Sequence, residues 1–573
     1  MAFLYADALF FVCIALITAV IHHSARSRSL PASLPPGPTG IPIFGNMLQI
    51  APAKLHTKFR EWALEYGKIF YLRLGPQPVI VLNTAEAADE LLANRSNKYS
   101  SRATPHVAYD ILSDGQRLAF KPYDKVWKTM RKCLQGAIGL NPSRRARKIQ
   151  ELESRVLLHD LLQYGDQTSL GSAVEGLHDM ILDHHWFAFV RRYTTSVVLY
   201  IMYGQRVHQL RDNPQLHKIY DVLNNIAKMA EPGAYLADVF PILRALPDFL
   251  APWRVHAQKM HLWQVHILLE MELWGGFLSS ARDALRNGVV RSGFVDSYLR
   301  ARAEAGHDDA TGNGLTDDGW MCDRLVAYAA GGILEAGSDT TASTIQSFLL
   351  FMLSYPHVLH RVQEEINAVV GSSRLPTFED EEKLPYLIAC IKETLRCRPP
   401  AIMGIPHKVE EDDVYEGHFI PKGSTVIGNV WAIHMDPIRF PDPMVFKPER
   451  FYTEGDPTKW GGGPDALHRS HYAFGWGRRF CQGSYIAEAS LFITLSRLIW
   501  GFNISALLDP KTGKTVVPDI TDEANWCDGI ITGPKLYGAK FTARSDRHAD
   551  LIRKMYEDVQ LEWQMMGLEG DNR

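Results

Sequence analysis

The sequence predicts a mainly α-helical fold with a smaller β part. A largely apolar stretch without proline runs from Asp318 to Ser354 and stops before Pro356, which is typical of one long helix. Helical patterns also dominate most of the chain from Thr84 onward. Strand-like segments are confined to three short regions, namely 71–82, 414–430 and 516–542.

The composition is that of an ordinary globular protein. Of the 573 residues, 46% are hydrophobic and 22% are charged, so disorder, collagen and coiled coil are excluded as the dominant state. The formal net charge of −3 gives no basic excess, and we expect no nucleic-acid partner. Seven scattered cysteines, an odd number, favour a reducing compartment over a disulfide framework.

Residues 1–22 predict an N-terminal membrane anchor. The run from Ala2 to Ile21 is almost entirely apolar, and a helix of this length spans about 30 Å, the thickness of a bilayer core. Arg26 and Arg28 follow the run and no lysine or arginine precedes it, so the N-terminus should cross the lipid bilayer and the body should stay in the cytosol. The alternative is a cleaved signal peptide, which would want a basic start and a small-residue cleavage site.

A basic and proline-rich hinge follows over residues 23–50. Three prolines within residues 35–38 forbid a helix and favour stiff, extended chain. The hinge is either an ordinary linker or a rigid spacer that sets the orientation of the body on the membrane. We assign residues 51–545 to the catalytic domain and residues 546–573 to a C-terminal helical tail that packs on the body or lies on a membrane or partner.

Glycine, proline and aspartate residues predict where the helices and strands of the catalytic domain end. Gly75-Pro76 predicts the turn of a β-hairpin within 71–82. Four glycines and four aspartates predict a loop over 306–319. The remaining elements are two helices over 352–370 that break at Pro356, a helix over 379–397 that ends before Pro399, and strands with turns at 416–417 and 421–423.

The most informative segment surrounds Cys481. Gly475, Gly477 and Gly483 permit a tight backbone that aims several N–H groups at one point. A helix is expected to begin near Ser484, and its positive end would then face the sulfur.

The chemistry of this segment favours a single metal ligand. Arg478 and Arg479 should lower the pKa of the Cys481 thiol and so favour the thiolate. A zinc site would need several cysteine or histidine ligands nearby, whereas one thiolate among N–H groups suits an axial ligand to haem iron. The alternative is a buried structural cysteine in a glycine-rich turn.

The same segment carries a family resemblance. The pattern Phe-x-x-Gly-x-Arg-x-Cys-x-Gly, from Phe474 to Gly483, resembles the haem-binding signature of the cytochrome P-450 superfamily at every fixed position. The match implies Cys481 as the axial thiolate to haem iron, with Phe474, Gly475 and Gly483 shaping the cofactor loop. Gln482 departs from the family, where proline, isoleucine or valine is commoner, and is expected to tune the iron potential slightly.

The resemblance extends from about Pro35 to Arg544 and implies the cytochrome P-450 fold. It further implies haem b as cofactor, O₂ and NADPH as co-substrates, and a separate membrane-bound NADPH–cytochrome reductase as electron donor. The activity implied is that of a haem-thiolate monooxygenase.

The long predicted helix contains a second motif, Ala336-Gly337-Ser338-Asp339-Thr340. An interior glycine costs about 1 kcal/mol relative to alanine, and hydroxyls that bond back to helix carbonyls bend the helix. We therefore expect a widened helix with a polar notch. The motif resembles the family's oxygen-binding motif, which implies Thr340 beside bound oxygen, Asp339 as the acid link of a proton relay, and Ala336 and Gly337 as cofactor contacts. The alternative is a packing patch of small residues.

Two further motifs resemble structural parts of the family. Glu393 and Arg396 are three residues apart, share a helix face and match Glu-x-x-Arg. Arg450, within Pro-Glu-Arg-Phe, is implied to close a buried Glu393–Arg396–Arg450 network that holds the cysteine segment.

Haem propionates need fixed cations and N–H donors. The match to a Trp-x-x-x-Arg helix implies Trp127 and Arg131 as two of them. Arg479, His407 and Arg102 are implied in the same role. Surface ion pairing is the alternative for each of these residues.

By family position, the substrate meets the 103–122 loop, the long helix before Gly337, the 400–405 loop and the 529–533 turn. The pocket residues expected there are His106, Ile111, Leu112, Ile333, Leu334, Ile402, Met403, Ile530 and Ile531. Such an apolar lining suits a hydrophobic, polycyclic substrate.

The overall pattern resembles fungal microsomal enzymes of secondary metabolism, of the O-methylsterigmatocystin oxidoreductase type. This implies a mycotoxin, polyketide or alkaloid pathway and the endoplasmic reticulum membrane, with a lumenal N-terminus. Hydroxylation is the expected reaction, and the same oxidising chemistry serves oxidative coupling, desaturation or ring closure as alternatives. A reductase-independent haem-thiolate isomerase and a non-enzymatic haem protein are further alternatives, against which intact Asp339 and Thr340 argue.

Overall fold

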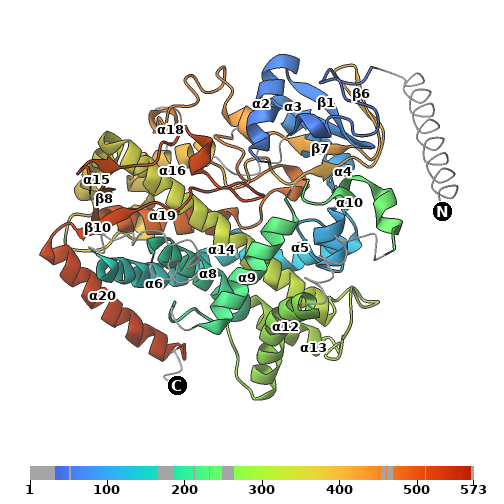
Figure 1. Ribbon diagram of the computed structural model, residues 1–573. Coiled ribbons are helices and arrows are strands. Elements are labelled where there is room, and N and C mark those ends of the chain that lie inside the picture. The colour runs from blue at the N-terminus through green and yellow to red at the C-terminus, as the bar shows by residue number, and fades with distance from the viewer. Residues whose placement is uncertain are drawn as a thin grey trace.

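The structure is a computed structural model that describes residues 33–50, 53–165, 185–210, 213–231, 233–247, 264–452, 460, 469–509 and 511–568. Helices fill most of the molecule, and a five-stranded sheet lies at one end, at the upper right of Figure 1. The prediction of a mainly α fold with a smaller β part is therefore confirmed. The predicted anchor and the first part of the hinge lie outside the described residues.

The helices vary from single turns to one helix that crosses the molecule. The α-helices are α2 (Leu55–Tyr66), α3 (Ala85–Ala88), α4 (Ser96–Tyr99), α5 (Lys125–Ile138), α6 (Leu140–Tyr164), α8 (Trp186–Tyr203), α9 (Pro214–Met229), α10 (Leu236–Val239), α12 (Gln264–Arg286), α13 (Phe294–Glu304), α14 (Asp323–Ser354), α15 (Pro356–Val369), α16 (Pro385–Cys397), α17 (Val430–His434), α18 (Glu449–Tyr452), α19 (Ser484–Gly501) and α20 (Asp546–Met565). Among the described helices, none is long and apolar enough to cross a bilayer.

The strands form three small sheets. The largest has the order β1 (Ile69–Leu74), β2 (Gln77–Leu82), β7 (Thr425–Gly428), β4 (His407–Lys408) and β3 (Ser101–Arg102). The second has the order β10 (Ala539–Ala543), β8 (Phe502–Leu508) and β9 (Thr515–Val516), and the third pairs β5 (Asp413–Tyr415) with β6 (His418–Ile420). In the antiparallel pair β3–β4, Arg102 lies opposite His407, so strand pairing brings an arginine and a histidine together from distant parts of the chain.

The described part of the predicted hinge is packed on this sheet. The Pro36 carbonyl accepts a hydrogen bond from the Tyr71 amide at 2.8 Å, and the Asn46 side-chain oxygen accepts one from the Arg73 amide at 2.8 Å. A Cβ at Gly37 would lie 1.8 Å from the Tyr71 carbonyl oxygen, which explains the glycine between prolines. The stiff chain predicted here is thus docked along β1.

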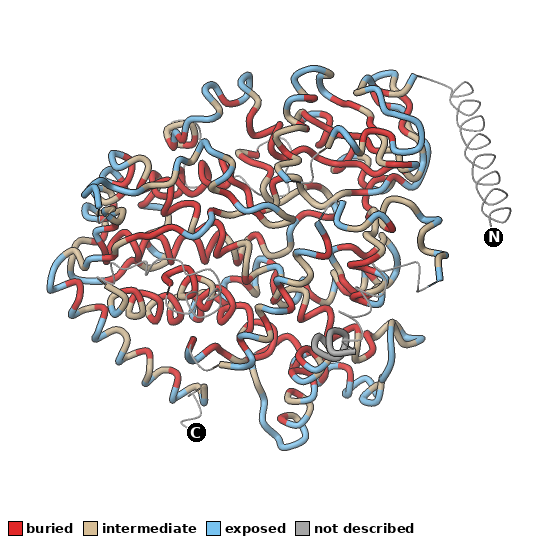
Figure 2. Tube along the Cα trace, viewed as in Figure 1, coloured by how far each residue is buried: buried red, intermediate tan, exposed pale blue. Residues whose placement is uncertain are grey.

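Helix α14 runs through the middle of the molecule and packs against α8, α12, α16 and α19 (Figure 1). Leu325, Phe348 and Leu349 on this helix are fully buried. Figure 2 shows the buried residues concentrated in these central helices and the exposed ones along the outer turns. Pro356 occupies the first turn of α15, which confirms the predicted break.

Two predicted helix starts are wrong. Helix α14 begins at Asp323 rather than at 318, because Gly319 has φ +87° and Cys322 is extended. The helix predicted over 379–397 is two elements, a 3₁₀ helix over Phe378–Lys383 and then α16, because a non-helical Leu384 precedes Pro385. The hairpin over 71–82 is confirmed with slightly longer strands, and 306–319 is a loop as predicted.

The C-terminal helix α20 packs on α6. Ile552, Val559 and Trp563 form its buried face. The Trp563 ring lies 4.3 Å from the guanidinium of Arg206, and Lys148 of α6 pairs with Glu562 at 3.2 Å. Of the alternatives for the tail, the structure shows packing on the body.

Glu523 joins three segments that are far apart in the sequence. Its carboxylate accepts a hydrogen bond from Arg398 at 2.8 Å and lies 3.1 Å from His56 Nε2 in α2. The Arg398 guanidinium stacks between the rings of Trp431 and Trp526. Burial raises the pKa of Glu523, but hydrogen bonds from His56 and Arg398 outweigh burial and lower the pKa to about 2.

We expect Glu523→Gln to destabilise the protein at neutral pH and to lose this effect in acid. Because the folded-state pKa of Glu523 lies below its ordinary value of 4.5, the carboxylate contributes stability above that value and loses it as the pH falls toward 2. Thermal unfolding of both proteins between pH 7 and pH 3 measures this, and the difference in Tm should shrink with falling pH. Glu61→Gln, in an exposed ion pair with Lys58, is the control. A pH-independent difference for Glu523→Gln would contradict the prediction.

Candidate active site

A cavity of about 330 Å³ lies between α14, α8, the start of α19 and the five-stranded sheet. This volume falls within the range of roughly 300–1,000 Å³ typical of ligand and cofactor pockets. Most of its wall is apolar. Its polar members include Cys481, three arginines, His407 and several hydroxyl side chains.

The segment before Cys481 is a tight turn that only glycine permits at two positions. Gly475 and Gly477 have φ of +75° and +52°. A Cβ at Gly477 would lie 2.2 Å from the Leu92 carbonyl oxygen. The Cys481 amide donates to the Phe474 carbonyl at 2.9 Å, so the segment closes on itself and turns the thiol into the cavity.

The Cys481 sulfur lies at the N-terminus of α19, as the sequence predicted. Burial raises the pKa of its thiol, while hydrogen bonds from the Gly483 and Ser484 amides and the nearby Arg131 guanidinium lower it. The two amide N–H groups and the guanidinium favour the thiolate form of Cys481, which is the form that binds a metal cation.

The prediction that Arg478 and Arg479 stabilise the thiolate is wrong. Arg478 is exposed and donates to the Tyr123 hydroxyl at 2.7 Å. Arg479 is buried and donates to the carbonyls of Ser100 and Lys121, both at 2.6 Å. The short 3₁₀ helix Gly477–Arg479 directs both side chains to these partners, and Arg131 of α5 takes the role that adjacency in sequence suggested for them.

Three arginines and His407 line the cavity without a carboxylate partner. Burial lowers the pKa of Arg131 to about 10. Burial and repulsion from neighbouring arginines lower the pKa of Arg102 to about 9 and of Arg479 to about 8, and hold the pKa of His407 well below its ordinary range, so its ring is neutral. Within the described residues no carboxylate pairs with the three arginines, and the buried Arg102 Nε has no partner. Such a cluster is suited to a ligand that carries more than one negative charge.

The motif in α14 places Thr340, Ala336 and Gly337 on the cavity wall. The Thr340 hydroxyl donates to the Ala336 carbonyl at 2.7 Å, as predicted for a back-bonding residue. The predicted widening is absent, and α14 remains a continuous α-helix here. A Cβ at Gly337 would lie 2.7 Å from a Val198 methyl, so the glycine serves close packing against α8.

Asp339 does not line the cavity. Its two carboxylate oxygens accept hydrogen bonds from Arg191 of α8 at 2.7 and 3.1 Å. The Arg191 guanidinium also lies 3.9 Å from the ring of Tyr220. The acid beside Thr340 is therefore held in an ion pair between α14 and α8.

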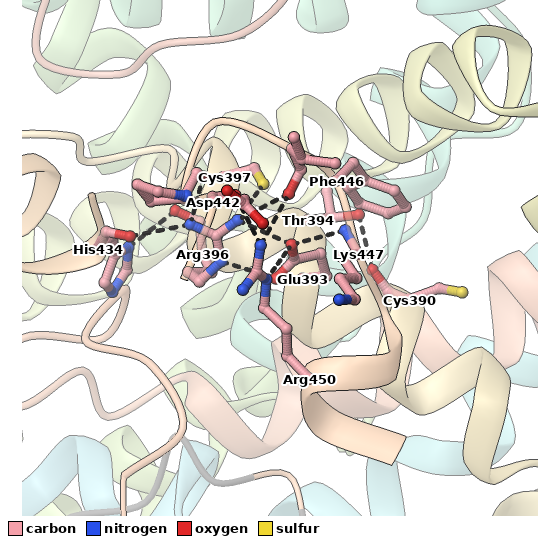
Figure 3. Close-up of polar contacts among 12 residues, drawn as sticks. Cys390, Glu393, Thr394, Arg396, Cys397, His434, Asp442, Phe446, Lys447 and Arg450 are labelled. Carbon is pink, nitrogen blue, oxygen red and sulfur yellow. Dashed lines mark hydrogen bonds and ion pairs between the residues drawn. The ribbon is translucent and has the colours of Figure 1, made fainter. Parts of the chain in front are cut away.

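Glu393, Arg396 and Arg450 form the network that the sequence predicted, shown in Figure 3. Arg396 donates to both oxygens of Glu393 at 2.7 Å, and Arg450 Nε lies 3.3 Å from the same carboxylate. The Lys447 amide donates to Glu393 at 2.8 Å. Glu393 and Arg396 are completely buried, and the geometry is that of a structural ion pair with every charge compensated.

His434 connects this network to the cysteine segment. Its Nδ1 donates to the Arg396 carbonyl at 2.9 Å, and its Nε2 accepts from the Tyr472 amide at 2.7 Å. Burial holds the pKa of His434 well below its ordinary range, in agreement with a neutral ring. Because the Tyr472 carbonyl accepts from the Gly475 amide, the chain of contacts reaches the turn that carries Cys481. The sequence analysis did not identify His434.

A family model described as Cytochrome P450 matches residues 35–519. The chain belongs to the cytochrome P450 family. It is 52% identical to Cytochrome P450 monooxygenase 79 and 54% identical to Cytochrome P450 monooxygenase 231 of Postia placenta, with 97% of each chain covered. It is 34% identical to Cytochrome P450 monooxygenase virE of Hypocrea virens, with 92% of this chain and 89% of that one covered. The protein is thus a P450 monooxygenase.

The P450 family implies haem and O₂-dependent oxidation, and the cavity fits haem by the chemistry of its donors. One thiol lies among backbone N–H groups, and unpaired cations match the two propionate charges. Cys481 would supply the thiolate ligand. Arg102, Arg131, Arg479 and His407 would hold the propionates.

Trp127, the fifth residue expected to bind a propionate, lies outside the cavity wall. Its ring stacks on the guanidinium of Arg479 at 4.0 Å and lies 5.3 Å from that of Arg131. The indole therefore orients the two arginines from behind.

Only Ile333 of the nine expected substrate residues lines the cavity. Leu334, its neighbour in α14, points about 100° away around the helix and is buried in the core. Ile402 packs against Trp431 and Met435. The others lie in neighbouring positions off the wall: Ile111, Leu112 and Ile530 share an apolar cluster with Tyr109, His106 pairs with Asp110, and Met403 and Ile531 do not reach the cavity.

The wall instead contains residues that sequence reasoning missed. Thr194, Val197, Val198 and Ile201 of α8 line the cavity, as do Leu118 and Ile405 in two of the expected loops. The α8 residues have helical spacing, which predicts one apolar face but not which neighbour that face meets. The loops were identified correctly, but the direction of each side chain within them was not.

We expect Arg396→Met to cost about 3–5 kcal/mol of folding free energy, because it leaves the buried Glu393 carboxylate without its main partner. Urea unfolding measures the loss, and haem content should fall with it, since His434 links this network to the cysteine segment. Arg361→Met is the control, because Arg361 pairs with Glu449 in an exposed ion pair worth at most about 1 kcal/mol. Equal losses in the two variants would contradict a special role for the buried network.

Proposed function

We propose that this P450 binds haem b through Cys481 and uses electrons from a separate NADPH–cytochrome reductase to hydroxylate a hydrophobic secondary metabolite in a fungal mycotoxin, polyketide or alkaloid pathway. The observation that carries the proposal is a single thiol that lines an apolar cavity together with a cluster of arginines that lack a carboxylate partner. When bound, haem supplies the activation of O₂. The residues of the chain position the substrate, exclude water and move protons.

Substrate contacts come from the apolar wall. Leu118, Ile333, Ala401 and Ile405 offer no charge and no free hydrogen-bonding side chain. The cavity arginines would be occupied by the haem propionates and would not be available to a substrate. A neutral, hydrophobic substrate therefore suits the remaining surface, since a charged one would lose its hydration without compensation.

Proton delivery is assigned to Asp339 and Thr340. Asp339 is partly exposed, so its carboxylate can take a proton from solvent when Arg191 releases it. The adjacent Thr340 hydroxyl lies on the cavity wall and can carry the proton inward from its resting bond to Ala336.

A reductase site is supported by exposed cations near the cysteine segment. Helix α5 packs against this segment, because Arg131 donates to the Phe480 carbonyl and Gln482 donates to the Arg131 carbonyl. Its exposed residues and those at the start of α6 include Lys125, Lys128, Lys132, Arg144 and Arg145. A surface of this charge favours an acidic electron donor.

Membrane association at the endoplasmic reticulum, with the catalytic domain cytosolic, is supported by two features. The apolar run at residues 1–22 has the length of a membrane span. In addition, exposed apolar side chains gather where the first described residues meet α10, with Phe44 and Phe240 in ring contact at 6.1 Å. The exposed members are Ile41, Ile43, Phe44, Leu48, Leu236 and Ile242. A bilayer would cover such a patch.

The function is tested by the reduced, carbon-monoxide-bound difference spectrum and by NADPH consumption with a reductase. The wild type should show the Soret band of thiolate-ligated haem, and Cys481→Ser should lose it. Cys527→Ser, a second exposed cysteine, is the control and should keep the band. A thiolate spectrum in Cys481→Ser would show that the ligand is wrong. Absence of haem from the wild type would overturn the proposal.

Thr340→Ala should retain haem but divert NADPH-derived electrons to hydrogen peroxide, because the inward proton path loses its hydroxyl. The ratio of peroxide released to NADPH consumed measures this. Thr344→Ala removes an equivalent back-bonding hydroxyl one turn further along α14 and outside the cavity, so it should leave the ratio unchanged. Unchanged coupling in Thr340→Ala would remove this residue from the relay.

Deleting residues 1–30 should release most of the protein from membranes but leave weak binding to phosphatidylcholine vesicles. The double variant Leu48→Glu with Ile242→Glu should abolish this remaining vesicle binding, because it places negative charges in the surface that contacts lipid. Met565→Glu is the control, because Met565 is similarly exposed but lies on α20, far from α10 in Figure 1. A larger effect of Met565→Glu in vesicle flotation would place the contact on the tail.

A further inference from the structure

The loop over residues 112–122, between the short helix His106–Ile111 and α5, forms part of the cavity wall. Leu118 lines the cavity. The Lys121 carbonyl accepts a hydrogen bond from Arg479, one of the cavity arginines, at 2.6 Å. The loop thus touches both the apolar surface assigned to substrate and the cationic cluster.

Two ion pairs connect this loop to α14. Arg117 pairs with Glu335, and their side chains are 3% and 12% exposed. Asp114 pairs with Arg324 at 3.2 Å, and their side chains are 48% and 23% exposed. The same loop and the same helix are therefore joined once in the interior and once at the surface.

The buried pair lies directly behind the wall. Glu335 is adjacent to Ala336 and two residues from Ile333, both of which line the cavity. On the loop side, Arg117 Nε donates to the Ser113 hydroxyl at 2.8 Å, and that hydroxyl donates to the Ala108 carbonyl at 2.7 Å. A continuous set of polar contacts thus runs from the His106–Ile111 helix through the loop to α14.

Glu335 depends on Arg117 for compensation of its charge. Burial raises the pKa of Glu335, and Arg117 is the group that lowers it. The second carboxylate oxygen, Oε1, is buried and has no partner within the described residues. Asp339, one turn further along α14, adds a repulsive charge. A carboxylate in this environment holds its arginine firmly, because separating the two would leave both charges buried and unpaired.

We propose that Arg117 and Glu335 are positioning residues that hold the 112–122 loop as the closed wall of the cavity, so that separation of this pair limits how fast bulky ligands enter and leave. The proposal rests on the proposed haem site, because the ligands used to test it bind there. It is independent of which substrate the enzyme oxidises.

The test uses the ferric holoenzyme and stopped-flow binding of 4-phenylimidazole, with imidazole as a small reference ligand. Glu335→Gln keeps the shape of the side chain but removes its charge. It should raise both the association and dissociation rates of 4-phenylimidazole by about tenfold, which corresponds to about 1.4 kcal/mol, and change imidazole rates much less. Limited trypsin digestion should also cleave at Arg117 or Lys121 faster than in the wild type.

Asp114→Asn is the matched control, because it removes the exposed ion pair between the same loop and helix and should leave all rates unchanged. The exchange Arg117→Glu with Glu335→Arg restores the pair and should restore slow binding. Should Glu335→Gln fail to retain haem, Arg117→Gln, which removes the same ion pair from the loop side, gives the same readout. Equal rates in wild type, Glu335→Gln and Arg117→Gln would overturn the proposal, whereas failure of the haem assignment would appear as a missing thiolate spectrum in the wild type.

Discussion

The Arg396 guanidinium is completely buried, and its N–H groups hold together segments on which the cysteine turn depends. It donates to Glu393 on its own helix, to the carbonyl of His434 at the end of α17 and to the carbonyl of Pro443 in the connection after α17. His434 passes this restraint to Tyr472 through a neutral ring with one donor and one acceptor nitrogen. The position of a single thiol is thereby set by a network of buried polar contacts, each of which has its partner.

Several buried charges elsewhere in the described structure have a partner of opposite charge. Glu153 is surrounded by Arg192 and Arg206, and Arg302 pairs with Asp323. The cavity arginines are different, because they face one another and lack a carboxylate. A folded chain tolerates such repulsion where a bound anion relieves it, and the contrast with these paired charges therefore supports the arginine cluster as the cofactor end of the cavity.

Successive turns of helix α14 form part of the cavity wall and hold two ion pairs to other elements. Thr340 and Gly337 form cavity wall, Asp339 is held by Arg191 of α8, and Glu335 is held by Arg117 of the covering loop. Successive acids at 335 and 339 lie one turn apart on the same helix side, yet each is paired with an arginine from a different element. Proton entry and ligand entry are therefore controlled by separate ion pairs on one rigid support.

The sequence by itself determined the parts that depend on local geometry. The cysteine turn requires left-handed glycines and a following helix, and both can be predicted from adjacent residues. The Glu393–Arg396 pair follows from helical spacing alone. The central helix and the hairpin follow from long, unbroken hydrophobic patterns, although the start of α14 was misplaced because loop glycines and helix residues look alike at such a boundary.

Only the tertiary structure decided which side chains meet. The thiol is influenced by Arg131 of α5 rather than by Arg478 or Arg479 beside it, because backbone direction and not sequence distance sets where a guanidinium points. Ile333 faces the cavity and Leu334 does not, and the apolar face of α8 became cavity wall only when α14 packed against it through Gly337. Periodicity predicts that a face is buried, but the partner of that face depends on packing between elements that are distant in the chain.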